Sequence, residues 1–156
     1  MFATKEKGFK LGVLEKIDAR LDSLERLKRE LEYMVISLVM EEEALLVELN
    51  QRQLSDGVNS DGQKIKPGYT ASTKRRKRRK GQPTSKVTLY DEGEHYAEIL
   101  AEESLNQIFM TSSAPHARYL QKKYGLNIHG LTEGSIDVVR QKIKPKLIEE
   151  IRNYIS

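Results

Sequence analysis

The chain contains no cysteine, and its longest largely apolar run, Met34 to Met40, is short. Without cysteine there is neither a disulfide framework nor a thiolate metal site. The apolar run is far below the ~20 residues that a helix needs to cross a bilayer. The first ten residues are basic, and no apolar signal core of useful length follows them. We therefore expect a soluble chain that is not exported and that does not enter a membrane.

Sequence motifs for catalysis are also missing. The chain has no G-x-S-x-G elbow, no P-loop and no G-x-G-x-x-G after a strand. Its three histidines, His95, His116 and His129, are widely spaced, and none has a second ligand at metal spacing. The acidic residues of 91–94 fit a turn into a helix N-terminus, and the turn formers of 56–62 lack two ligands of a calcium loop. We predict a protein that is not an enzyme and that holds no metal and no cofactor.

Hydrophobic residues make up only 38% of the chain, against 32% charged residues, which is little for a sizeable core. This balance predicts an elongated shape, or a surface that is buried only on assembly. From about residue 10 to residue 54, apolar residues recur at near-heptad spacing, with Lys28 and Glu42 as exceptions. The apolar positions are Leu14, Ile17, Leu21, Leu24, Leu31, Val35, Leu38, Leu45 and Leu49. The spacing predicts one helix of ~65 Å, or two helices with a break near 31–36.

One part of this helical segment is apolar almost all round. It contains Met34, Val35, Ile36, Val39 and Met40. A helix that is apolar on every side needs neighbours on several sides, more than one short domain easily supplies. We expect these five residues to form an oligomer or partner interface.

A run of seven consecutive cations dominates the middle of the chain. It consists of Lys74, Arg75, Arg76, Lys77, Arg78, Arg79 and Lys80. The whole chain has 27 Lys+Arg against 23 Asp+Glu; without these seven the count is 20 against 23, so a formal charge of +4 becomes −3. The basic character of the protein is therefore local. The surrounding residues 63–86 are polar and lack apolar periodicity, which predicts an extended arm or flexible loop.

Three interpretations of the basic run remain open. It is a solvated loop, a contact to the phosphate backbone of nucleic acid, or a contact to acidic protein surface, including Glu41–Glu43 of another copy. Because no aromatic residue lies between Tyr69 and Tyr90, the run has no stacking platform. Sequence-specific readout is therefore not expected.

The rest of the chain predicts a small α/β module. We expect strands at 86–90 and 107–112, a helix at 93–104, and a helix that starts after Ser113 and stops at Gly125. A final helix follows Thr132, and Pro145 should kink or restart it. The predicted organisation is an N-terminal helical segment (1–55), an extended basic arm (56–86) and the module (86–156). The predicted fold class is α+β, with a two- to four-stranded sheet packed with helices.

Residues 87–96 (VTLYDEGEHY), 115–125 and 130–132 (GLT) follow one another in an order that resembles the tail-completion, or head–tail joining, proteins of tailed bacteriophages. Residues 87–96 (VTLYDEGEHY) are similar to the family's strand, acidic turn with glycine, and helix. Residues 115–125 are similar to its helix after the second strand, and Gly130-Leu131-Thr132 to the turn before its terminal helix. Glu92 stands where the family has threonine, and 127–129 (NIH) where it has arginine-proline-phenylalanine. The resemblance covers about 86–156.

This resemblance implies a non-enzymatic virion protein that assembles as a homo-oligomeric ring at the neck, after folding in the bacterial cytoplasm. Its implied partners are neighbouring neck, portal or tail proteins, with the basic run touching DNA backbone or acidic subunits. The alternative is a small nucleic-acid-binding protein without sequence preference that acts outside a virion.

Overall fold

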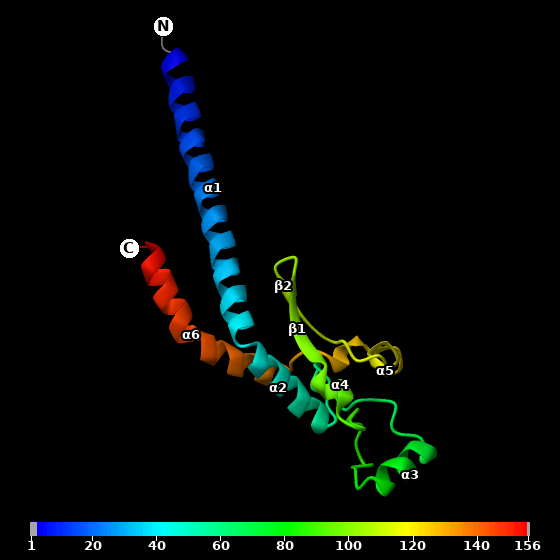
Figure 1. The fold of residues 1–156 in the computed structure, drawn as a ribbon. Helices are drawn as coiled ribbons and strands as arrows, with labels where there is room; N and C mark the ends of the chain where they lie inside the picture. Colours follow the sequence, from blue (N-terminus) through cyan, green and yellow to red (C-terminus); the bar gives the residue numbers. More distant parts are fainter. Residues whose placement is uncertain (1–2, 156) are drawn as a thin grey trace.

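The computed structural model describes residues 3–155 and, within them, the side chains of residues 12–154. The fold is α+β, as predicted: a long N-terminal helix projects from a body that contains shorter helices and one antiparallel hairpin (Figure 1). None of the helices between residues 3 and 155 is both long enough and apolar enough to cross a membrane.

The N-terminal segment forms two helices. Helix α1 (Ala3–Glu41) and helix α2 (Glu43–Ser55) are separated at Glu42, whose φ of −98° and ψ of 26° leave the helical region. The break therefore lies after the apolar stretch and not within 31–36. It falls in the acidic triplet Glu41–Glu43, and Nζ of Lys146 lies 3.0 Å from a carboxylate oxygen of Glu41 and 3.4 Å from one of Glu42.

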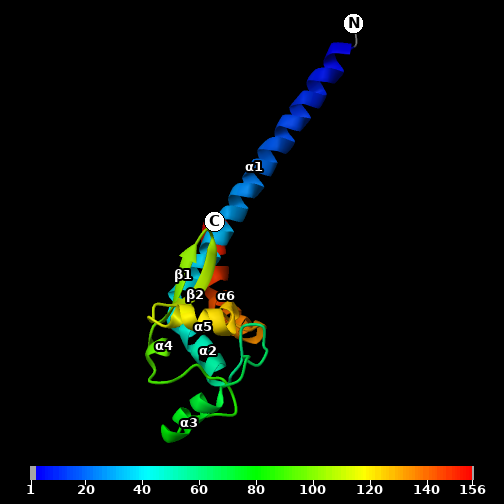
Figure 2. The same cartoon turned by 90° about the vertical axis from the view of Figure 1, so that its right-hand side faces the viewer.

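The predicted extended arm contains a helix, α3 (Ala71–Arg79), so the expectation of an extended conformation is wrong for these residues. Thr70 caps this helix, because its hydroxyl accepts a hydrogen bond from the backbone N–H of Thr73 at 3.3 Å. Arginine and lysine are good helix formers, and Gly81, with a φ of +66°, supplies the left-handed turn after the end. Figures 1 and 2 place α3 at the far end of the molecule from the start of α1.

Residues 86–90 do not form the predicted strand. Val87, Thr88 and Leu89 are buried, but Leu89 has a φ of +55°, which ends an extended conformation. In place of a neighbouring strand, the hydroxyl of Tyr69 accepts hydrogen bonds from the backbone N–H groups of Thr88 (2.9 Å) and Leu89 (3.1 Å). The hydroxyl of Tyr96 donates to the carbonyl of Thr88 at 2.6 Å. Side chains therefore satisfy backbone groups that a sheet would otherwise pair.

These bonds lead to a stability prediction. Tyr69→Phe removes the acceptor of two backbone N–H groups in a buried segment, so we expect the free energy of unfolding to fall by about 1–3 kcal/mol. Tyr90→Phe is the control, since Tyr90 is exposed and lies in the same loop. Equal urea denaturation midpoints for the two variants would contradict the role given to Tyr69.

The predicted helix over 93–104 is also wrong, except for the single turn α4 (Glu94–Ala97). Residues Ile99–Ser104 form strand β1, which pairs in antiparallel register with β2 (Gln107–Ser112), the strand that was predicted. Between them, Leu105 and Asn106 both have positive φ, as a two-residue hairpin turn requires. Pairing with β2 and burial of Ile99 and Ala101 on one face outweigh the local helical preference of the segment.

The C-terminal part follows the prediction more closely. Helix α5 (Ala117–Tyr124) stops at Gly125, and a 3-10 turn, η1 (Leu126–Ile128), leads to helix α6 (Glu133–Ile155). The hydroxyl of Thr132 accepts a hydrogen bond from the N–H of Ser135 at 3.3 Å and so caps α6. Helix α6 continues through Pro145 and changes direction along its length (Figure 1).

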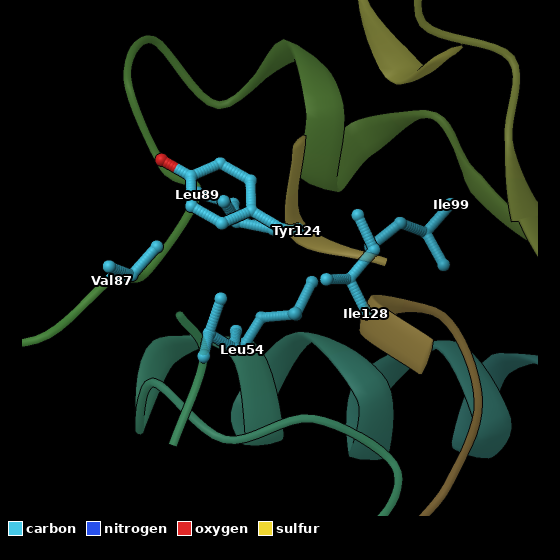
Figure 3. Close-up of a cluster of buried hydrophobic side chains, with 7 residues drawn as sticks. Leu54, Val87, Leu89, Ile99, Tyr124 and Ile128 are labelled. Atoms are coloured by element: carbon cyan, nitrogen blue, oxygen red, sulfur yellow. The ribbon is translucent and has the colours of Figure 1, made fainter. Parts of the chain in front are cut away.

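Two small hydrophobic clusters hold the body together. The first lies between α2, the 87–89 segment, α5 and η1, and part of it is drawn in Figure 3. It comprises Leu54, Ile65, Val87, Leu89, Ile99, Tyr124 and Ile128. The second joins α1, α2, β1 and α6 through Leu38, Leu46, Ala101, Val139 and Ile143. Buried Asn50 joins α2 to the segment 128–130, since its amide donates to the carbonyls of Ile128 (3.2 Å) and Gly130 (2.8 Å).

Candidate functional site: the basic helix and its surroundings

The seven cations lie on α3 and the residue after it, and the helix divides them into two groups. Arg76, Lys77 and Lys80 face the loop of residues 90–92, and we call them the inward cations. The side chains of the other four have no hydrogen bond or ion pair within the described part of the chain; of these, Arg75, Arg78 and Arg79 are exposed. Spacing of three and four residues places these three on one face of the helix. We call them the outward arginines.

Lys77 anchors α3 to the body, and only 3% of the residue is exposed. Its ammonium group donates to the backbone carbonyl of Tyr90 and, at 3.0 Å, to the side-chain oxygen of Gln82. The same group lies 4.9 Å from the centre of the Tyr69 ring, within the range of a cation–π interaction. A buried cation is tolerated because polar and aromatic partners replace its water.

The other two inward cations bind acidic side chains of the same loop. Nζ of Lys80 lies 2.7 Å from an oxygen of Asp91 and 3.2 Å from one of Glu92, and Arg76 lies 3.5 Å from Asp91. The hydrogen bond from Lys80 lowers the pKa of Asp91, and Arg76 and Lys77 add to the effect. The acids that precede α4 in sequence therefore act as counter-charges for Arg76 and Lys80 and hold α3 against the body.

The docking of α3 leads to a prediction for Lys77. Lys77→Met leaves the Tyr90 carbonyl and the Gln82 side-chain oxygen without their donor, a loss worth about 1–3 kcal/mol. We expect amide hydrogen exchange in residues 71–80 to become faster by about tenfold or more. Arg78→Met, one residue along and facing outward, is the control and should leave exchange unchanged. Equal exchange in both variants would show that Lys77 does not hold the helix.

A polar cleft of about 500 Å³ lies beside α3, between the loop of residues 89–95 and α5. Its wall includes Tyr69, Arg76, Lys77, His116, Tyr119 and Lys123, together with the acids Asp91, Glu92 and Glu94. The ring nitrogen Nδ1 of His116 lies 3.6 Å from an oxygen of Glu94. The wall contains three cations and three acids, so its charges give no reason to assign the cleft an anionic or a cationic ligand.

The three histidines, which are far apart in the sequence, come together at this cleft, whose wall includes His95 and His116. The ring centre of His95 lies 5.2 Å from that of His129 and 5.8 Å from that of His116. His95 is buried, and neither of its ring nitrogens has a hydrogen-bond partner. Burial, with a smaller effect of the two neighbouring imidazoles, lowers the pKa of His95 to about 4. Among the residues that the structure describes, no three histidine or acidic side chains are arranged to hold a metal ion.

The predicted partner interface on α1 is partly used within the chain. Ile36 is buried, and Val35, Val39 and Met40 pack against the second hydrophobic cluster; Met34 is half-buried. Val35 and Val39 also line an apolar groove of about 310 Å³, whose other walls come from β2, α2 and α6. Apolar side chains with greater exposure lie earlier in α1, where the sequence pattern had shown the same heptad spacing.

These exposed side chains form one stripe, which we call the α1 stripe. It consists of Val13, Leu14, Ile17, Leu21 and Leu24, whose exposed fractions lie between 42% and 61%. The heptad spacing was visible in the sequence, but the sequence did not show which part of the helix the body would leave uncovered. Figures 1 and 2 show this half of α1 extending away from all other elements.

A function for this chain has to be inferred from these surfaces. Comparison with known protein families, with characterised proteins and with solved structures found no match.

Proposed function

We propose that this chain is a virion structural protein of the neck or tail-completion type in tailed bacteriophages, a ring-forming subunit that joins head and tail. The observation that carries the proposal is the α1 stripe. It presents five apolar side chains in a row on a helix that leaves the body. A monomer rarely leaves such a surface open, whereas a subunit that is completed by its neighbours needs one.

The order of elements in the second half supports the bacteriophage assignment. The extended segment 87–89, the acidic turn 91–93 and α4 follow one another as in the family that residues 86–156 resemble, although no strand forms at 86–90. Strand β2, α5 and α6 then come in the expected order, whereas strand β1 was not expected.

In such a ring, α3 is the contact to the phosphate backbone of DNA. The inward cations are occupied by the body, so the outward arginines supply the contact. They lie on α3, which contains no aromatic residue of its own, and this fits contact with phosphate and not with bases. The outward arginines would also accept the acidic side chains of a neighbouring subunit.

The test is the size of the assembled particle. We expect light scattering and negative-stain imaging to show rings, formed by the chain alone or after co-expression with the virion proteins encoded beside it. Only monomers or dimers under all these conditions, co-expression included, would rule out the ring.

A second candidate function has one observation in its favour. The outward arginines would also serve a small nucleic-acid-binding protein that acts outside a virion and has no sequence preference. That protein would bind DNA in a salt-dependent manner as a monomer and would not associate with virion proteins. The same size measurement, made with and without DNA, separates the two functions.

A further inference from the structure

The α1 stripe follows a heptad pattern along a helix that is continuous in the structure. Counting from Leu14, the a positions hold Leu14, Leu21, Lys28 and Val35, and the d positions hold Ile17, Leu24, Leu31 and Leu38. These positions run for more than three heptads along a continuous helix, as a coiled coil requires. The last heptad, from Val35 onward, is covered by the body, and the earlier ones are open.

We propose that α1 packs against α1 of other copies of this chain, with the helices parallel and in register, and with more than two helices in each bundle. The proposal rests on the self-assembly proposed above and names the surface and the partner. The direction of the helices, their register and their number in the bundle each follow from charges and side chains on α1.

Charges beside the stripe set the direction. The first three e positions are acidic, Asp18, Glu25 and Glu32, and the fourth, Val39, lies in the part that the body covers. In an antiparallel pair, e positions face e positions, so acids would meet acids. In a parallel pair, each g position faces the next e position of the partner, which brings Arg20 against Glu25 of the other copy. Charge complementarity therefore favours the parallel arrangement.

The width of the stripe sets the number of helices. Three of the four g positions are apolar, namely Val13, Leu27 and Met34, so the apolar face covers a, d and g. A two-stranded seam covers a and d alone, and a third apolar column requires a further neighbour. Lys28 interrupts the a column and binds Glu32 of its own helix at 3.7 Å. A single polar residue at an a position selects register and helix number at some loss of stability.

A parallel bundle has a consequence for the whole assembly. All bodies lie at the same end of the bundle, related by rotation about its axis, which is closed cyclic symmetry. The bundle would thus stand on one side of the ring, with α3 of every copy on the other side.

Cysteine crosslinking in the full-length chain tests direction and register, because the chain has no cysteine of its own. Leu14→Cys places a thiol at an a position near the end of the stripe, where parallel helices in register bring equivalent residues together and antiparallel helices hold them far apart. We expect a short bis-maleimide reagent to join chains of this variant. The control is Arg26→Cys, at the f position on the opposite face, which should remain uncrosslinked. An oligomer in which Leu14→Cys crosslinks no better than Arg26→Cys would overturn the parallel arrangement.

A charge exchange tests the Arg20–Glu25 pairing between copies. We expect Arg20→Glu alone and Glu25→Arg alone each to raise the concentration at which the oligomer dissociates by about tenfold, since every neighbouring pair in the bundle is affected. The double variant should restore the original value, as measured by mass photometry over a dilution series. Two damaging single changes without rescue would overturn the pairing.

These outcomes separate the inference from the proposed function. Rings that are unaffected by changes in α1 would refute the α1 bundle and leave the ring in place. Crosslinked bundles that never associate with virion proteins would support the bundle and refute the neck function. A chain that stays monomeric with or without those proteins would refute both.

Discussion

Replacing the three outward arginines with glutamine should weaken binding to duplex DNA by on the order of a hundredfold at 50 mM salt, with no change in fold. Each arginine that neutralises a phosphate releases a counterion, so losing three contacts also lowers the slope of log affinity against log salt by about 2.7. Glutamine is a helix former comparable to arginine, and the side chains of Arg75, Arg78 and Arg79 have no partner within the described residues that the change would break. The measurement is fluorescence anisotropy with a labelled duplex at several salt concentrations.

The matched control removes three other exposed cations from the body. Lys122, Lys142 and Lys144 lie on α5 and α6, so their change to glutamine alters the net charge equally but leaves α3 intact. Equal loss of affinity in both triple variants would show that net charge and not α3 governs binding. Unchanged affinity in the arginine variant would indicate that the partner of α3 is an acidic protein surface and not DNA.

Acidification should destabilise the protein by roughly 2–3 kcal/mol between pH 7 and pH 4.5 through His95 alone. Burial lowers its pKa from the ordinary value of 6.5 to about 4, so over this interval the unfolded chain binds a proton that the folded chain does not. Stability is therefore fully present above pH 6.5 and is lost as the pH falls toward 4. Burial also lowers the pKa of His129, which adds an effect of the same sign.

Urea denaturation at a series of pH values measures this effect. His95→Leu should remove most of the fall in unfolding free energy between pH 7 and pH 4.5. His116→Gln keeps His95 buried and should keep the fall. If His95→Leu retained the full pH dependence, another group would have to carry it.

The sequence predicted those elements whose stability depends on local pattern. Heptad spacing indicated the N-terminal helices, and Thr132 and Gly125 marked helix ends correctly. Helix α3 could not be found in this way, because a helix that is polar all round has no apolar period. It is held by a threonine cap and by contacts of Lys77 and Lys80 with residues more than ten positions away.

The hairpin shows a second reason why the sequence did not predict every element. Tyr96, Ile99 and Leu100 have helical spacing, and only the pairing partner β2 makes Ile99–Ser104 a strand. The histidine cluster is likewise invisible in the sequence, since α4, α5 and η1 must pack together before its rings meet. The seven cations of the basic run are visible in the sequence. Their division into inward and outward cations is not, because it depends on the formation of α3 and on the loop that binds it.

The first part of α1 projects from the body as a long arm (Figure 1). Leu38 and its neighbours fix the last turns of α1 in the second hydrophobic cluster, so the arm consists of residues 3–34. The arm is ~48 Å long, so a bend of 10° where it leaves the body would displace its far end by ~8 Å. Because long helices bend gently, identical subunits of the assembly proposed above would reach neighbours at slightly different distances through a small bend spread over a few turns.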